Sequence, residues 1–293
     1  MADTLFDKDF LKRIEYLNLI ARRLVFGRQQ AQHQSVRKGA SIEFRDFREY
    51  SPGDDPRTVD WTVYARLGEL VIKLFRQEEE LDLWVLLDRS GSMNFGDPNK
   101  FDHARRIAAA LAYIGMSNMD SASIVPFTNK LEPGRTQLRG RGRIFNVFEF
   151  LDDLKTGGVT DPAASLQEFV SRVRRPGLIV LLSDFYGLER VRAGLDRLRF
   201  FKHQIYVMQV ASPWEINPTI RGELRLVDCE TQDFDDLTIT DSMLRRYKKA
   251  FADFSEDIKR YGMKYAIGYA LARTDTPFDA FLRTVLERGG LVA

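Results

Sequence analysis

The sequence contains few of the sulfur and imidazole side chains from which many sites are built. Among its 293 residues there is one cysteine, Cys229, which cannot close a disulfide within the chain. Three scattered histidines add no cluster of the kind that structural zinc requires. A lone cysteine fits a reducing compartment, and we therefore expect a cytoplasmic protein without a zinc centre.

Long apolar runs are also missing. The most apolar stretches, residues 108–116 and 178–182, are far shorter than the roughly 20 residues that a transmembrane helix needs. Residues 1–17 carry acidic side chains where a signal peptide would carry basic ones. We expect neither a membrane span nor export.

Neither sign of charge dominates the chain. The 44 Lys and Arg residues and the 42 Asp and Glu residues leave a formal net charge of +2, which provides no general attraction to nucleic acid. The phosphate-binding patterns GxGxxG and GxxxxGK[ST] follow none of the strands predicted below. A basic loop with Arg139, Arg141 and Arg143 lacks the interleaved aromatic residues of a nucleic-acid site, so we interpret it as a solvated loop. We expect no nucleic-acid partner.

Hydrophobic side chains, in contrast, make up 44% of the chain, which is enough for a sizeable buried core. From residue 81 onward, short apolar segments alternate with amphipathic helical patterns. Strands that are apolar on every face are typical of a parallel sheet covered by helices on both sides. The predicted fold class is α/β, doubly wound, with a mostly parallel sheet. The expected strands are residues 81–88, 121–127, 177–185 and 203–210, and the expected helices are residues 101–114, 144–154, 163–173 and 188–200.

The part of the chain before this region has a different pattern. Residues 5–26 have the apolar spacing of an amphipathic helix. Residues 42–47 and 70–75 are predicted to form short extended segments, which indicates a small β-element. The turn-rich segment 51–61 between them is interpreted as a structured turn, with Trp61 anchored in the core, rather than as a second metal site.

We therefore divide the chain into two parts. Residues 1–79 form an N-terminal helix and a small β-subdomain, and residues 80–293 form the main domain. Within the main domain, prolines and glycine interrupt the alternation at about 212–240, which predicts a β-hairpin insertion. The remaining expected elements are a helix at 242–261, a last strand at 263–270 and a terminal helix opened by Pro277.

Oxygen-bearing side chains stand at three places in this pattern. Two of the places follow predicted strands, and the third is the start of a predicted helix. Asp88, Ser90 and Ser92 are alternate residues after the first strand, so in an extended segment they point to the same side. Thr160 lies at the start of a predicted helix, and Asp184 ends another strand. Because parallel strands end at one edge of the sheet, we expect these five side chains to meet there. Oxygen ligands alone favour Mg²⁺, or Mn²⁺ or Ca²⁺, over zinc or copper.

The charge of this set suggests a function. Two carboxylates and three hydroxyls hold a dication while leaving coordination positions to water, and a partner's Asp or Glu can replace one water. We therefore expect a non-enzymatic, metal-dependent protein-binding site.

Each fragment of the set also has a structural interpretation, because a DxSxS turn or a Thr-Asp-Pro sequence is an ordinary helix start. The chief alternative function is a metal-dependent phosphohydrolase of the haloacid dehalogenase type, which also carries an Asp after the first strand. That chemistry resembles a DxD pattern with the second Asp as general acid. Ser90 stands in that position here and is a poor proton donor.

At these residues the sequence resembles the von Willebrand factor A family, whose metal-ion-dependent adhesion site combines a DxSxS loop with a distant threonine and a distant aspartate. Asp88, Ser90 and Ser92 match the loop. Thr160 matches the threonine, and Asp184 matches the late aspartate. The resemblance implies a Rossmann-like fold and a metal bound directly by the two serines, with the aspartates acting mostly through water.

Three further segments are distinctive: REYSPGDDPRTVDW, VIKLFRQEEE and RTDTPFDAFLRTVLERGGLV. They resemble the bacterial proteins grouped as domain of unknown function fifty-eight, and this resemblance covers the chain from about Ser35 onward. Members of that group are commonly encoded beside MoxR-type AAA+ ATPases. The resemblance therefore implies an adaptor or assembly role with such an ATPase or its client.

Overall fold

The computed structural model describes residues 5–33, 44–52, 54–75, 82–119, 121–229 and 232–288. The chain forms two compact units, of which the larger comprises Met1–Phe26 with Leu81–Ala293 and the smaller comprises Gly27–Glu80. This division differs from the sequence-based boundary between residues 79 and 80. The reason is that the N-terminal helix, α1 (Lys8–His33), contributes Phe10, Ile14 and Leu17 to the core of the larger unit.

The larger unit is built on a six-stranded sheet with the order β10-β7-β6-β3-β4-β5. Neighbouring strands are parallel except for β5, which pairs antiparallel with β4 at one edge. A mixed α/β fold with a mostly parallel sheet was predicted and is confirmed, although β5 was not expected. The strands are β3 (Asp82–Asp88), β4 (Ser121–Phe127), β5 (Arg135–Leu138), β6 (Leu178–Ser183), β7 (Gln204–Ala211) and β10 (Gly268–Arg273).

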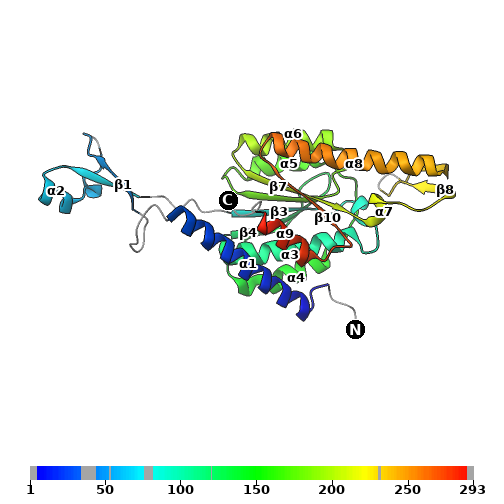
Figure 1. Ribbon diagram of the computed structural model, residues 1–293, viewed down its shortest axis with the longest axis horizontal. Helices are drawn as coiled ribbons and strands as arrows, with labels where there is room; N and C mark the ends of the chain where they lie inside the picture. Colours follow the sequence, from blue (N-terminus) through cyan, green and yellow to red (C-terminus); the bar gives the residue numbers. More distant parts are fainter. Residues whose placement is uncertain are drawn as a thin grey trace. The chain divides into compact units, whose positions relative to one another are not determined.

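Helices cover both faces of this sheet (Figure 1). One face is covered by α3 (Lys100–Asn118), α4 (Ile144–Asp153), α9 (Phe278–Glu287) and the first part of α1. The other face is covered by α5 (Pro162–Arg172), α6 (Leu188–Phe200) and α8 (Asp241–Lys264). The predicted helices in the alternating region agree with α3, α4, α5 and α6 to within a few residues at each end.

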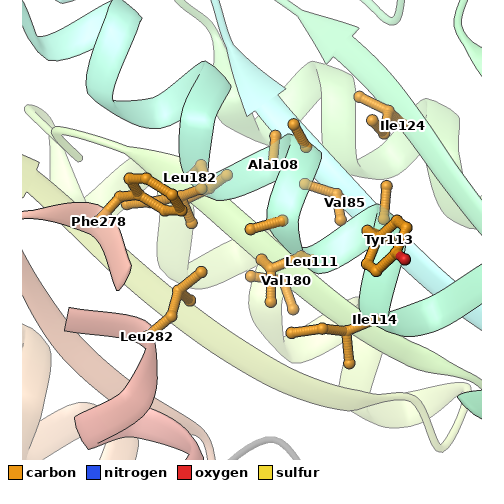
Figure 2. Close-up of a cluster of buried hydrophobic side chains, with 14 of the residues drawn as sticks. Val85, Ala108, Leu111, Tyr113, Ile114, Ile124, Val180, Leu182, Phe278 and Leu282 are labelled. Atoms are coloured by element: carbon orange, nitrogen blue, oxygen red, sulfur yellow. The ribbon is translucent and has the colours of Figure 1, made fainter. Parts of the chain in front are cut away.

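The core on the first face shows why the strands are apolar on both sides. Figure 2 shows Ala108 of α3 near Val85, and Leu111 of α3 near Val180 of the sheet. Phe278 of α9 belongs to the same cluster. These side chains are at most 6% exposed. Intervening strand residues such as Leu86 and Leu181 point to the second face and are equally buried. The double burial fixes the register of each central strand, because a one-residue slip would exchange its two faces.

The region after β7 contains the predicted hairpin, formed by β8 (Gly222–Val227) and β9 (Phe234–Ile239). It also contains a short helix that was not predicted, α7 (Pro213–Ile216). The last strand begins later than the predicted residue 263, because α8 continues to Lys264 and the strand starts at Gly268. Among the described residues, no helix is both long and apolar enough to cross a membrane.

The smaller unit contains β1 (Phe44–Glu49) and β2 (Val71–Phe75), which pair antiparallel, and the helix α2 (Trp61–Leu67). Residues 42 and 43 of the predicted first strand lie outside the described residues. The three aspartates between the strands have local hydrogen bonds: Asp54 accepts from Arg48, and Asp55 and Asp60 cap the helical turns that follow them. The prediction that Trp61 is anchored in a core was wrong, since Trp61 is 60% exposed.

Candidate metal site

The candidate site lies where the order of the strands reverses. From β3 the chain continues to β4 on one side and later returns to β6 on the other, so β3 and β6 are neighbours. In doubly wound sheets such a switch point leaves a crevice outside the carboxyl ends of the two strands. Asp88 ends β3, and Asp184 directly follows β6. The topology therefore brings these two carboxylates to the same crevice.

Hydrogen bonds connect Asp88, Ser90 and Ser92 within their loop. Asp88 is 1% exposed and Ser90 is fully buried. The Asp88 Oδ1 accepts a hydrogen bond from the Ser90 amide at 2.9 Å, and the hydroxyls of Ser90 and Ser92 are 3.0 Å apart. The segment is not extended throughout, because Gly91–Met93 form a 3₁₀ turn. The two hydroxyls nevertheless remain together, as the alternate spacing predicted.

Thr160 belongs to a segment that lies beside this loop. The amide of Gly157 donates to the Arg89 carbonyl at 2.8 Å, and the amide of Gly91 donates to the Gly158 carbonyl at 3.0 Å. Gly158 has a φ of +85°, a backbone conformation that favours glycine. Thr160 follows two residues later and is half-buried. The backbone thus brings the threonine segment to the edge of the sheet that carries Asp88.

Asp184 is bound to a buried lysine that the sequence analysis did not identify. The Lys100 Nζ donates to the Asp184 Oδ2 at 2.9 Å and to the Glu215 Oε1 at 2.5 Å. Lys100 begins α3 and is fully buried, and Glu215 on α7 is 8% exposed. Tyr186 also donates its hydroxyl to the Glu215 Oε1 at 3.0 Å. Three carboxylates and one ammonium therefore share this region.

Lys100 and Glu215 each stand at a helix start. An acidic residue is common there, so Glu215 does not by itself indicate a site. Lys100 follows Asn99, which caps α3 with its side chain. Glu215 is the fourth residue of the sequence Ser-Pro-Trp-Glu, which forms a capping box around Ser212. The one available signal was the lysine itself, because a cation in the first turn of a helix opposes the helix dipole.

The electrostatics of the site indicate an excess of negative charge. Burial, and after it the charge of Asp184, raises the pKa of the Asp88 carboxyl to about 7, although Ser183 and Ser90 donate hydrogen bonds to it. Burial by itself lowers the pKa of Lys100, but the charges of Asp184 and Glu215 outweigh burial and the pKa is raised. With all four groups ionised, the cluster carries a formal charge of −2.

The donor set fits a hard dication. A divalent ion would neutralise the formal charge, and the five candidate ligands, Asp88, Ser90, Ser92, Thr160 and Asp184, offer only oxygen. In the described part of the chain, no three His, Cys, Asp or Glu side chains are grouped so as to hold a metal by themselves. A metal would therefore depend on the hydroxyls of Ser90, Ser92 and Thr160 together with Asp88 and Asp184.

Comparison with known proteins finds relatives that are described as uncharacterized proteins. Uncharacterized proteins of Mycobacterium bovis and Mycobacterium tuberculosis are 25% identical to this chain over 263 residues, covering 87% of this chain and 81% of theirs.

Two solved structures are more distant. An aerotolerance-related membrane protein from Bacteroides fragilis is 16% identical, with a TM-score of 0.41, over 72% of this chain and 98% of that one. The conserved hypothetical protein BatB from Bacteroides thetaiotaomicron is 15% identical, with a TM-score of 0.38, over 71% of this chain and 96% of that one. Likeness at this level does not bear on function.

A protein family matches most of the chain directly. The match extends over residues 46–257 and includes the Asp88 loop, the Thr160 segment, Asp184 and the Lys100–Glu215 pair. The protein belongs to the family described as protein of unknown function DUF58.

Proposed function

We propose that this protein is a non-enzymatic binding protein with a von Willebrand factor A-like domain. Its metal-ion-dependent adhesion site holds one Mg²⁺, which Mn²⁺ or Ca²⁺ can replace, through Asp88, Ser90, Ser92, Thr160 and Asp184. The metal offers a coordination position to an aspartate or glutamate of a partner protein.

The convergence of three separate loops is the observation that carries this proposal. The Asp88 loop is hydrogen-bonded to the segment before Thr160, and Asp88 accepts a hydrogen bond at 2.6 Å from Ser183, the neighbour of Asp184. Residues up to 96 positions apart in the sequence thus meet at one crevice of the sheet. Turn formation or helix capping at each fragment would not require the three to meet.

The charges support a dication as the ligand. A buried carboxylate without a counter-charge is costly, and the raised pKa of Asp88 expresses that cost. A bound dication supplies the missing positive charge. Because three of the five ligands are neutral hydroxyls, the ion retains a strong attraction for one further carboxylate.

Exposed apolar side chains near the site support a protein as the partner. Phe95 and Tyr186 flank Lys100, with their rings 5.8 and 5.4 Å from its Nζ. Val159 precedes Thr160, and Trp214 precedes Glu215. The four apolar side chains are 45–48% exposed and come from four different loops or helix ends. Apolar groups around a polar anchor are typical of protein interfaces, where they exclude water from the central contact.

The identity of the partner follows from the family resemblance rather than from geometry. We propose a MoxR-type AAA+ ATPase or its client, in the cytoplasm. A phosphohydrolase of the haloacid dehalogenase type remains the alternative activity. It would need a general acid near Asp88, and the residue two positions later is Ser90, whose hydroxyl faces Ser92.

A binding experiment with defined components tests the proposal. The protein is immobilised and offered a purified MoxR-type ATPase from the same organism, in Mg²⁺ or in EDTA. We expect capture in Mg²⁺ only, and loss of capture in the double variant Ser90→Ala, Ser92→Ala. The matched control is Ser171→Ala, Ser242→Ala, two exposed serines on α5 and α8. Equal capture in EDTA, or by the Ser90/Ser92 variant, would refute metal-dependent binding.

A further inference from the structure

Lys100 lies between the candidate metal site and a carboxylate that is not one of the proposed ligands. Its Nζ is 2.9 Å from the Asp184 Oδ2 and 2.5 Å from the Glu215 Oε1. The side chains of Lys100, Asp184 and Glu215 are 1%, 6% and 9% exposed, so water screens their charges poorly. Glu215 is itself held in place, because its Oε2 accepts from the Ser212 amide at 2.8 Å.

A buried ammonium beside Asp184 opposes the binding of a second cation there. The ammonium occupies one oxygen of Asp184, and its positive charge repels a metal ion in the same crevice. Glu215 reduces both effects. It accepts a hydrogen bond from the same ammonium group, and its negative charge compensates the positive charge of Lys100. Removal of the Glu215 charge alone would leave two carboxylates and one ammonium, with a formal charge of −1 in place of −2.

We infer that Glu215 is a positioning residue that sets the affinity of the metal site through Lys100. It binds no metal. Its negative charge keeps the Lys100 ammonium neutralised, so that Asp88 and Asp184 together present their full charge to a dication. This inference rests on the proposed metal site and assigns it a determinant of affinity outside the five proposed ligands.

A purely structural role for Glu215 makes a different prediction. If Glu215 only capped α7, then Glu215→Gln would leave metal affinity unchanged, because glutamine also closes a capping box, and the charge of Lys100 would not matter. If the charge is decisive, removal of both Lys100 and Glu215 charges returns the cluster to −2 and restores affinity.

Calorimetric titration of the full chain with Mn²⁺ separates these roles. We expect Glu215→Gln to weaken Mn²⁺ binding by about tenfold or more, because a poorly screened unit charge is lost near the ion. The double variant Lys100→Met, Glu215→Gln should bind within about threefold of the wild type, since its charge is again −2. Glu215→Asp, which retains the charge, should lie close to the wild type as well. The matched control is Glu256→Gln, at an exposed position on α8.

The outcomes distinguish this inference from the proposed function. A wild-type protein that binds no Mn²⁺ would overturn both. Wild-type binding with unchanged affinity in Glu215→Gln would overturn only the inference. Weakening in Glu215→Asp without weakening in Glu215→Gln would assign Glu215 a structural role, because glutamine keeps the capping box and loses the charge. This comparison holds even if the variant without Lys100 fails to fold.

Discussion

The buried histidine on α3 predicts a loss of stability in mild acid. His103 is 5% exposed, and its Nε2 has no hydrogen-bond partner among the described residues. Burial, and after it the charge of Arg106, lowers the pKa of His103 to about 4, while the charge of Asp275 opposes this shift. An unfolded chain would protonate this histidine near its ordinary pKa of 6.5.

The sign and size of the effect follow from proton linkage. Below pH 6.5 His103 is protonated in the unfolded chain, whereas in the folded protein it stays neutral until about pH 4. The free energy of unfolding therefore falls as the pH falls through this window. A full shift of this size corresponds to about 3 kcal/mol, and at pH 5 the loss attributable to His103 is about 2 kcal/mol.

Urea unfolding at pH 7 and pH 5 measures this contribution. The wild type and His103→Leu are compared, because the other titrating groups act alike in both proteins and cancel in the difference. We expect the variant to lose about 2 kcal/mol less than the wild type between the two pH values. Equal losses would refute the assignment of a buried, neutral imidazole.

Three further predictions concern the candidate site and the two units. In EDTA at pH 8, Asp88→Asn should stabilise the protein by on the order of 1 kcal/mol, because a buried charge without a counter-ion is removed, and added Mg²⁺ should no longer raise its melting temperature. Leu17→Ala should cost about 2–5 kcal/mol in a urea titration because α1 packs into the larger unit, while Leu19→Ala, at a position 55% exposed on the same helix, should cost less than about 0.5 kcal/mol. Trp61→Ala should change the free energy of unfolding by less than about 1 kcal/mol, and a larger loss would show that this exposed ring has contacts beyond its edge-on contact with Tyr64.

The sequence predicted the sheet because its central strands are apolar on every face. Val85 and Leu86 point to opposite cores, and this uninterrupted apolar pattern is typical of buried parallel strands. The edge strand β5 carries no such pattern, since three of its four residues are exposed. Its position depends on pairing with β4, which is a tertiary contact that a local pattern cannot express.

The candidate site could be proposed from the sequence because parallel strands end at one edge of a sheet. Polar residues that follow these strands are therefore expected to lie near one another. The pair formed by Lys100 and Glu215 could not be proposed, since these residues lie 115 positions apart and Glu215 fits the ordinary start of a helix. Trp61 illustrates the opposite error. A large aromatic residue suggested burial, but the cap at Asp60 starts a helix there whose residues remain exposed or half-buried.

The proposed function depends most on the presence of one dication among five oxygen-bearing side chains. Equilibrium dialysis of the purified protein against Mn²⁺ measures this directly, as the number of ions bound per chain. We expect one Mn²⁺ per chain in the wild type and in Ser171→Ala, Ser242→Ala, and none in Ser90→Ala, Ser92→Ala at the same free concentration. No bound Mn²⁺ in the wild type would contradict the proposed site. So would one bound Mn²⁺ per chain in the Ser90/Ser92 variant.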